Sequence, residues 1–278
     1  MRVYQIPEAS KNSAGRVIQN LLSLPKEDKI KAYINIKDLK DEDFLKSHNV
    51  IFCTKKGLVK KTSMEQYSRP RSNGIQAISI NEGDQLLDVR LTDGKSEILI
   101  ANKSGKLIRF PEEKVRSMGR VAAGVRGIKL AEGEDDAVVG MAVVDPNDPS
   151  TTILVVSEKG NGKRSELESY RITNRGGKGV KTINVTNKTG ALVALKDVRE
   201  DDDLMITNKS GIIIRVSVKD LRVMGRATQG VKLIRLDEGD EIADVGVVRD
   251  GGKDTSDNYQ DKNDSEDKVE DTVSGEEE

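Results

Sequence analysis

Short apolar runs recur along the chain, and each is followed by a glycine-bearing turn and a second apolar run. In one unit, the run at 98–100 precedes Gly105 and a second run at 106–109. Strand, short glycine turn and strand is the pattern of a β-hairpin. A polar, basic loop ending in glycine follows in each unit, then a third strand such as 231–236 and a closing strand such as 241–248. No unit sustains helical periodicity over twelve residues, which disfavours a helical solenoid.

The units are related to one another in sequence. Residues 102–133 and 208–239 match at 16 of 32 positions without a gap. Spacings of 48, 55 and 51 residues separate the glycines of the hairpin turns, Gly57, Gly105, Gly160 and Gly211. Four strands in about fifty residues is typical of propeller blades. The sequence therefore predicts an all-β, propeller-like β-pinwheel of repeated four-stranded antiparallel blades over residues 1–249. The expected units are about 1–48, 49–97, 98–151, 152–201 and 202–249.

The first unit is expected to be incomplete. Gly15 takes the place that Gly74 has in the second unit, where the hairpin turn precedes it by 17 residues. The corresponding turn and its leading strand would lie before Met1. The chain is therefore expected to be a fragment, or to start inside a longer protein.

Charge divides the chain into two parts. Residues 250–278 hold 12 acids and 3 lysines and almost no large apolar side chain, which predicts a disordered acidic tail of net charge −9. Subtracting these from the 46 Lys+Arg and 47 Asp+Glu of the whole chain leaves 43 and 35, a body of net charge +8. The overall charge of −1 thus hides a basic body. Two roles remain open for the tail, an aid to solubility or a regulatory role.

The basic residues gather in the same part of each unit, between the second strand and the following glycine and just beyond it. If the units are arranged radially, these loops share a rim, and the charges form a band suited to a curved phosphate backbone. Their recurrence at matching positions favours DNA binding over a chance distribution. The densest site runs from Arg175 to Gly179. The predicted DNA contacts are Arg69, Arg71, Arg116, Arg120, Arg126, Arg171, Arg175, Gly176, Gly177, Lys178, Gly179, Lys181, Arg222, Arg226 and Lys232.

Other chemistry finds little support. The single cysteine, Cys53, excludes an internal disulfide framework, and the single histidine, His48, removes most histidine-based catalysis. Paired acids such as Asp135 and Asp136 are more typical of solvent-facing turns than of a metal site. No run approaches eighteen apolar residues, so no transmembrane helix is expected. We expect a cytoplasmic protein without a metal or cofactor of its own.

Three stretches resemble a known family: 3–10 (VYQIPEAS), 116–120 (RSMGR) and 228–235 (TQGVKLIR). They are similar to blades of the C-terminal domain of the DNA gyrase A subunit, part of a bacterial type IIA topoisomerase, and the likeness covers essentially residues 2–249. The resemblance implies a pinwheel whose basic rim binds and wraps double-stranded DNA, supporting ATP-dependent negative supercoiling. It also implies the gyrase B subunit and the upstream part of the A subunit as partners in an A2B2 holoenzyme on the bacterial chromosome. ATP and Mg²⁺ would be used elsewhere in that assembly.

The resemblance has gaps at functional positions. The family's basic box lies in its first blade, which is absent here, whereas 173–179 (TNRGGKG) resembles the box in a later blade and lacks its leading Gln. The family's catalytic tyrosine belongs to the upstream breakage domain, and no tyrosine here has a matching context, so this chain alone is expected to be no enzyme. Two alternatives remain: the C-terminal domain of the topoisomerase IV A subunit, and a protein-interaction propeller with an incidental basic rim.

Overall fold

The computed structural model describes residues 3–10, 13–22, 24–25, 27–71, 73–132 and 135–249. The predicted acidic tail at 250–278 lies outside the described residues. Antiparallel strands dominate these ranges, joined by turns and 3₁₀ helices, with one short α-helix, α1 (Glu42–Ser47). The all-β prediction is confirmed. None of the described helices is long and apolar enough to cross a membrane.

The described strands form four sheets. In spatial order, the first sheet contains β3 (Leu86–Thr92), β1 (Asn49–Thr54), β2 (Leu58–Ser63) and β6 (Val125–Arg126). The second contains β10 (Val180–Lys181), β5 (Lys106–Pro111), β4 (Glu97–Asn102) and β7 (Val138–Val144). The third contains β11 (Leu192–Val198), β8 (Thr152–Ser157), β9 (Asn161–Glu166) and β14 (Val231–Lys232). The fourth contains β13 (Ile213–Ser217), β12 (Asp203–Asn208) and β15 (Ile242–Val248).

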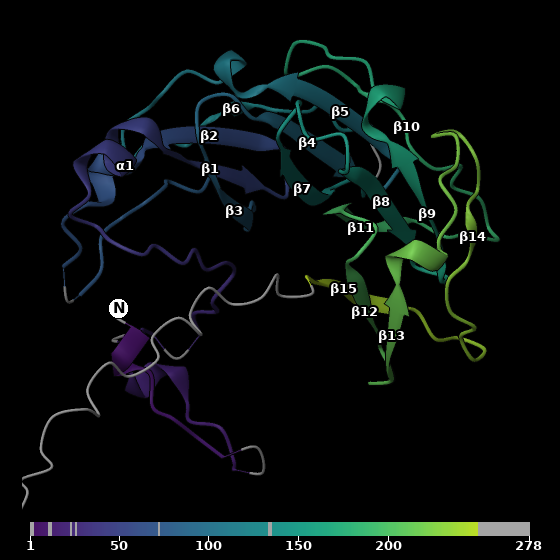
Figure 1. The fold of residues 1–278 in the computed structure, drawn as a ribbon, viewed down its shortest axis with the longest axis horizontal. Helices are drawn as coiled ribbons and strands as arrows, with labels where there is room; N and C mark the ends of the chain where they lie inside the picture. Colours follow the sequence, from purple (N-terminus) through teal and green to yellow (C-terminus); the bar gives the residue numbers. More distant parts are fainter. Residues whose placement is uncertain are drawn as a thin grey trace, which may run out of the picture.

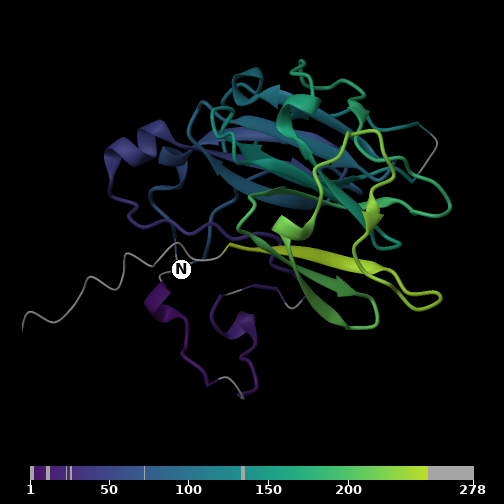
Figure 2. The same cartoon turned by 45° about the vertical axis from the view of Figure 1, so that its right-hand side comes forward.

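The sheets follow one another along an arc (Figure 1). The closing strands β3, β7, β11 and β15 lie on its inner side, and the two-residue strands β6, β10 and β14 lie on its outer side. Figure 2 shows the fourth sheet, in light green and yellow, at the end of this succession. The radial arrangement expected from the repeat is therefore present, and the outer strands mark the rim.

The first unit departs from the prediction of a blade. Its described residues form 3₁₀ helices, η1 (Val3–Gln5) and η2 (Ile18–Asn20), and the helix α1, but no strand. Backbone donors and acceptors of an extended segment need a partner strand. Within the described part of the chain, no strand pairs with this segment, so it does not extend a sheet. The fourth sheet also has three strands instead of four among the described residues.

The third strand of each unit corrects a second expectation. The stretch 231–236 is a strand only at Val231–Lys232, and it pairs with β9 of the preceding unit rather than with its own blade. β6 and β10 pair in the same way with β2 and β5. Each four-stranded sheet is therefore completed by the unit that follows it.

Glycine allows each unit to lend its outer strand to the preceding sheet, which we call the strand exchange. Gly124, Gly179 and Gly230 precede the three outer strands with φ angles of 103°, 72° and 76°. A Cβ at each would lie only 2.5–2.6 Å from a carbonyl oxygen of the strand below. Only glycine combines this left-handed conformation with so close an approach.

The alternation of strand residues builds one core between each pair of sheets. In β4, Ile98 and Ile100 pack toward the first sheet with Cys53, whereas Leu99 and Ala101 pack toward the third. All five are 0% exposed, and burying a side chain the size of Ile or Leu contributes about 1.5–3 kcal/mol. Cys53 is a buried free thiol, and its burial raises the pKa of that thiol. A further core packs β1 against α1 and against the loop that precedes β3.

Basic side chains at one repeated strand position tie each blade to the next. Lys61 Nζ donates to the Glu112 carbonyl at 3.0 Å, Arg109 Nη1 to that of Leu167 at 2.7 Å, and Arg164 Nε to that of Leu221 at 2.7 Å. Each acceptor lies in or just after the 3₁₀ helix of the following blade, η4 (Glu112–Lys114), η5 (Leu167–Ser169) or η6 (Val218–Asp220). These three cations are structural, so the positive charge of the body is not all on its rim.

Candidate nucleic-acid interface

Three of the predicted basic loops, those that lead into β6, β10 and β14, lie on the outer side of the arc, and the loop of the second unit lies at the end of the arc near α1 (Figure 1). We call these four the outer loops, residues 68–71 with 73–74, 116–124, 171–179 and 222–230. The last three cross the preceding blade and are bonded to it by the N–H groups of Met118, Thr173 and Met224. These donate to the carbonyls of Lys61, Arg109 and Arg164 at 2.8, 2.9 and 2.9 Å. At its other end, each of the three loops runs into β6, β10 or β14, so it is held at both ends.

The predicted basic residues keep their charges uncompensated. Across the part of the chain that the structure describes, none of the twelve forms an ion pair, although twelve ion pairs occur elsewhere. Unpaired cations in a row raise the local positive potential and attract polyanions. The exposed members are Arg69, Arg71, Arg116, Arg126, Arg171, Lys178, Lys181, Arg222 and Lys232, and the half-buried ones are Arg120, Arg175 and Arg226.

Two of the half-buried arginines tie their outer loop to the preceding outer strand, β6 or β10. Arg175 donates from Nη1 to the Arg126 carbonyl at 3.0 Å and from Nε to that of Lys114 at 2.9 Å. Arg226 donates from Nη1 at 2.9 Å to the carbonyl of Lys181, which occupies the position equivalent to Arg126. Both guanidinium groups retain further N–H donors. The structure thus gives Arg175 and Arg226 a linking role. Their direct contact with DNA remains a prediction.

The glycine-rich loop packs closely on residues 127–129, the segment that follows β6. The Gly176 N–H donates to the Gly127 carbonyl at 2.6 Å, and the Lys129 N–H donates to that of Gly177 at 2.8 Å. Gly176, with φ of 81°, and Gly179 serve this packing, whereas Gly177 is exposed. A Cβ on Gly176 would meet the Arg126 carbonyl oxygen, and a Cβ on Gly179 would meet that of Leu107 in β5.

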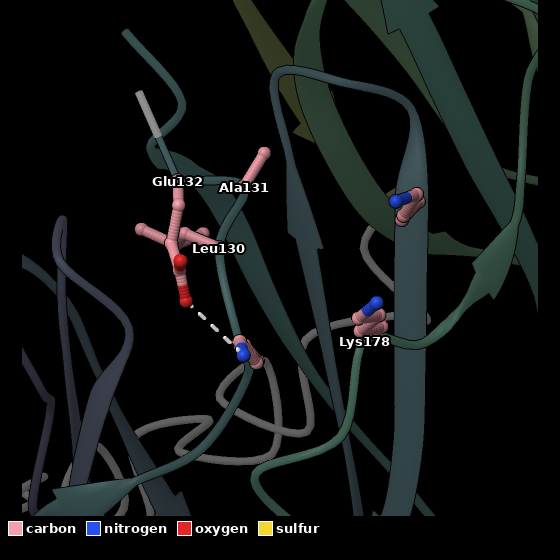
Figure 3. A pocket seen from close by; sticks show the side chains of 6 residues that line it. Leu130, Ala131, Glu132 and Lys178 are labelled. Atoms are coloured by element: carbon pink, nitrogen blue, oxygen red, sulfur yellow. Dashed lines mark ion pairs between the residues drawn. The ribbon is translucent and has the colours of Figure 1, made fainter. Parts of the chain in front are cut away.

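A basic pocket lies where outer loop 171–179 meets β5 and the segment that follows β6. It has a volume of about 290 Å³, and Figure 3 shows Lys178 across from Leu130 and Glu132. Lys106, from the start of β5, and Lys129, which follows β6, add two more ammonium groups to its lining. Glu132 offsets part of this charge, because its Oε1 lies 3.2 Å from Lys129 Nζ.

Lys106 and Lys129 were not among the residues predicted from sequence. They lie outside the stretch in which basic residues recur, and only the strand exchange brings them beside Lys178. A second pocket of about 310 Å³ lies where outer loop 222–230 meets β10. It is lined by Ser169, Arg171, Val180 and Arg226.

The family profile described as "DNA gyrase C-terminal domain, beta-propeller" matches residues 1–47, 48–93, 96–145, 151–199 and 202–249. The chain belongs to this family. Its sequence is 42% identical over 254 residues to the DNA gyrase A subunit of Staphylococcus aureus strain NCTC 8325 / PS 47, covering 91% of this chain and 28% of that protein. Identity to the A subunit of strain MRSA252 is 41% over 260 residues, covering 94% and 29%. The chain thus spans less than a third of the length of these relatives.

Solved structures share the fold of this gyrase C-terminal domain. The C-terminal domain of DNA topoisomerase IV superposes with a TM-score of 0.78 at 24% identity, covering 89% of this chain and 74% of that one. The DNA gyrase A C-terminal domain gives 0.73 at 24% identity, covering 89% and 77%. The predicted β-pinwheel class is confirmed by these matches. The first profile match, over 1–47, falls on the unit whose described residues contain no strand.

Proposed function

We propose that this chain binds duplex DNA along its outer loops and wraps it around the arc. It would do so as the C-terminal part of a gyrase A subunit. The observation that carries the proposal is the row of twelve basic side chains without ion pairs on the described outer loops and strands. A duplex carries one negative charge per about 1.7 Å of its axis, and its binding is dominated by contacts to phosphates.

Wrapping follows from the curvature of the row. Bending a site of 20–30 base pairs by 40–90° costs on the order of 1–6 kcal/mol, which contacts from successive loops offset. Aromatic residues make up only 3% of the chain, so stacking platforms for single strands are scarce. The proposal is therefore for duplex DNA, held by its backbone with little reading of bases.

The wider assembly belongs to the same proposal. The relatives are gyrase A subunits, and this chain corresponds to under a third of them. We propose the gyrase B subunit and the upstream part of the A subunit as its partners, in a holoenzyme that supercoils DNA negatively with ATP and Mg²⁺ bound elsewhere. This chain would itself neither cleave DNA nor hydrolyse ATP, and it would act in the bacterial cytoplasm.

Salt titration of duplex binding tests the proposal. With about 6–10 phosphates contacted, the affinity should fall by about 10³–10⁵ between 50 and 200 mM salt, measured by fluorescence anisotropy. An affinity independent of salt would contradict backbone binding. Wrapping is read separately, by relaxing a closed plasmid with a nicking-closing enzyme in the presence of the chain and measuring the change in linking number. Capture of protein partners without any duplex binding would favour the interaction propeller instead.

A further inference from the structure

We propose that two buried lysines, Lys60 and Lys163, are positioning residues that hold outer loops 116–124 and 222–230 in their DNA-binding shape. The inference rests on the proposed function, and it adds two residues that do not themselves reach the surface. Both are 0% exposed.

The two lysines occupy the same repeat position. Lys60 is the third residue of β2 and Lys163 the third residue of β9, whereas β5 has Ile108 there. Ile108 is 2% exposed and packs in an apolar core, so a branched apolar side chain fills this position well. Placing an ammonium group there instead is costly unless it is fully hydrogen-bonded. We therefore expect the lysines in β2 and β9 to do more than fill the core.

The amines are bonded to the loops that cross above them. Lys60 Nζ donates to the Arg120 carbonyl at 2.7 Å and to the Ala77 carbonyl, and it lies 4.7 Å from the centre of the Phe52 ring. Lys163 Nζ donates to the Gly225 carbonyl at 2.5 Å and to Thr228 Oγ1 at 3.1 Å. Among the described residues, no carboxylate takes part in either set. The loop backbone is thus the group that the buried charge stabilises.

These bonds fix the peptide groups beside two predicted DNA contacts. The Arg120 carbonyl belongs to the peptide that follows Arg120, and the Gly225 carbonyl belongs to the peptide that precedes Arg226. Hydrogen bonds to a charged donor are stronger than neutral ones, so they restrict the peptide plane more firmly. Loop 171–179 lies over Ile108, where no lysine is available, and it is held by backbone bonds to residues 127–129 and to Arg109.

The charged and titratable neighbours of these amines are few. Arg120 lies near Lys60, as does Tyr67, whose hydroxyl donates to the Ala77 carbonyl at 3.2 Å, and Arg226 lies near Lys163. Burial, followed by the like charge of the arginine, lowers the pKa of each lysine to about 8. Raising the pH through 8 should therefore remove the charge from both anchors and loosen the loops.

The test compares Lys60→Met/Lys163→Met with wild type in the full chain. Binding of a duplex at pH 7 and fixed salt should be about tenfold weaker, because charge-assisted bonds to two loops are lost. The matched control Lys46→Met/Lys196→Met removes the same charge from α1 and β11 and should stay within about twofold of wild type. Ile108→Met, at the equivalent position, should also bind normally. Equal losses in the control and test variants would overturn the inference.

Two further readouts separate positioning from loss of folding. Amide hydrogen exchange should quicken in 116–124 for Lys60→Met alone and in 222–230 for Lys163→Met alone, with 171–179 unchanged. From pH 7 to 9, wild type should lose more affinity than the double variant. Unchanged exchange and matching pH profiles would sink the inference. If wild type binds no duplex, the proposed function fails, while the exchange experiment still decides whether these lysines anchor the loops.

Discussion

At the scale of single residues, what a basic side chain touches decides its role. Lys61, Arg109 and Arg164 donate to carbonyls of the next blade, whereas the outer-loop cations stand free of carboxylates within the described part of the chain. The outer-loop cations could be predicted from the sequence, because basic residues recur in the polar loop of each unit. The sequence could not predict Lys60 and Lys163, because a lysine in an alternating strand indicates a solvent-facing position. Only the loop crossing above turns that position into the interior.

Glycine gives a residue-scale prediction about stability. Gly179→Ala should destabilise the fold by about 1–3 kcal/mol, because its φ is 72° and the new Cβ would lie 2.5 Å from the Leu107 carbonyl oxygen. Gly177→Ala is the control in the same loop, since its nearest neighbour would be 3.5 Å away. Urea unfolding measures both. Equal unfolding midpoints for the two variants would contradict the argument.

At the scale of elements, the hairpins and the repeat could be predicted, but the partners of the third strands could not. The apolar runs on either side of the glycine turn predict β4 and β5 from the sequence. β10 is only two residues long, and nothing in Val180–Lys181 says which sheet it joins. The exchange is set by the close approach at Gly179. The pairing of β10 with β5 also creates the pocket beside Lys178. That pocket could not be predicted, because the sequence does not show which sheet β10 joins.

The outer loop 171–179 yields an element-scale prediction. Arg175→Glu/Lys178→Glu should weaken duplex binding by at least tenfold, because two cations become two anions on the phosphate path. Thermal unfolding should change little, because Lys178 is exposed and the two carbonyl bonds of Arg175 lie at the surface. Anisotropy and a melting curve provide the two measurements. Retained binding would move the DNA path away from this loop.

At the scale of the whole molecule, the sequence joins a basic body to a C-terminal segment of opposite charge. The −9 of residues 250–278 nearly matches the +8 of the body. An acidic segment tethered to the chain competes with phosphates at high effective concentration, and salt screens that competition.

Removing the tail should therefore strengthen DNA binding. A chain ending at Arg249 is expected to bind duplex more tightly than the full chain, with the larger difference at 50 mM than at 200 mM salt. Parallel salt titrations of the two chains measure it. Identical affinities at both concentrations would leave the tail with a solubility role alone.

The exchange of outer strands also bears on how the chain is made. β2 is complete at Ser63, but the strand that closes its sheet, β6, begins at Val125. A ribosome must therefore extend the chain by 62 residues, from 63 to 125, before that edge can be covered, and by 69 and 65 residues at β5 and β9. β13 has no outer strand in the described part of the chain, and its Ile213 is 57% exposed. During synthesis, each of the three sheets that contain β2, β5 and β9 therefore presents an open edge until the unit that follows it has been made.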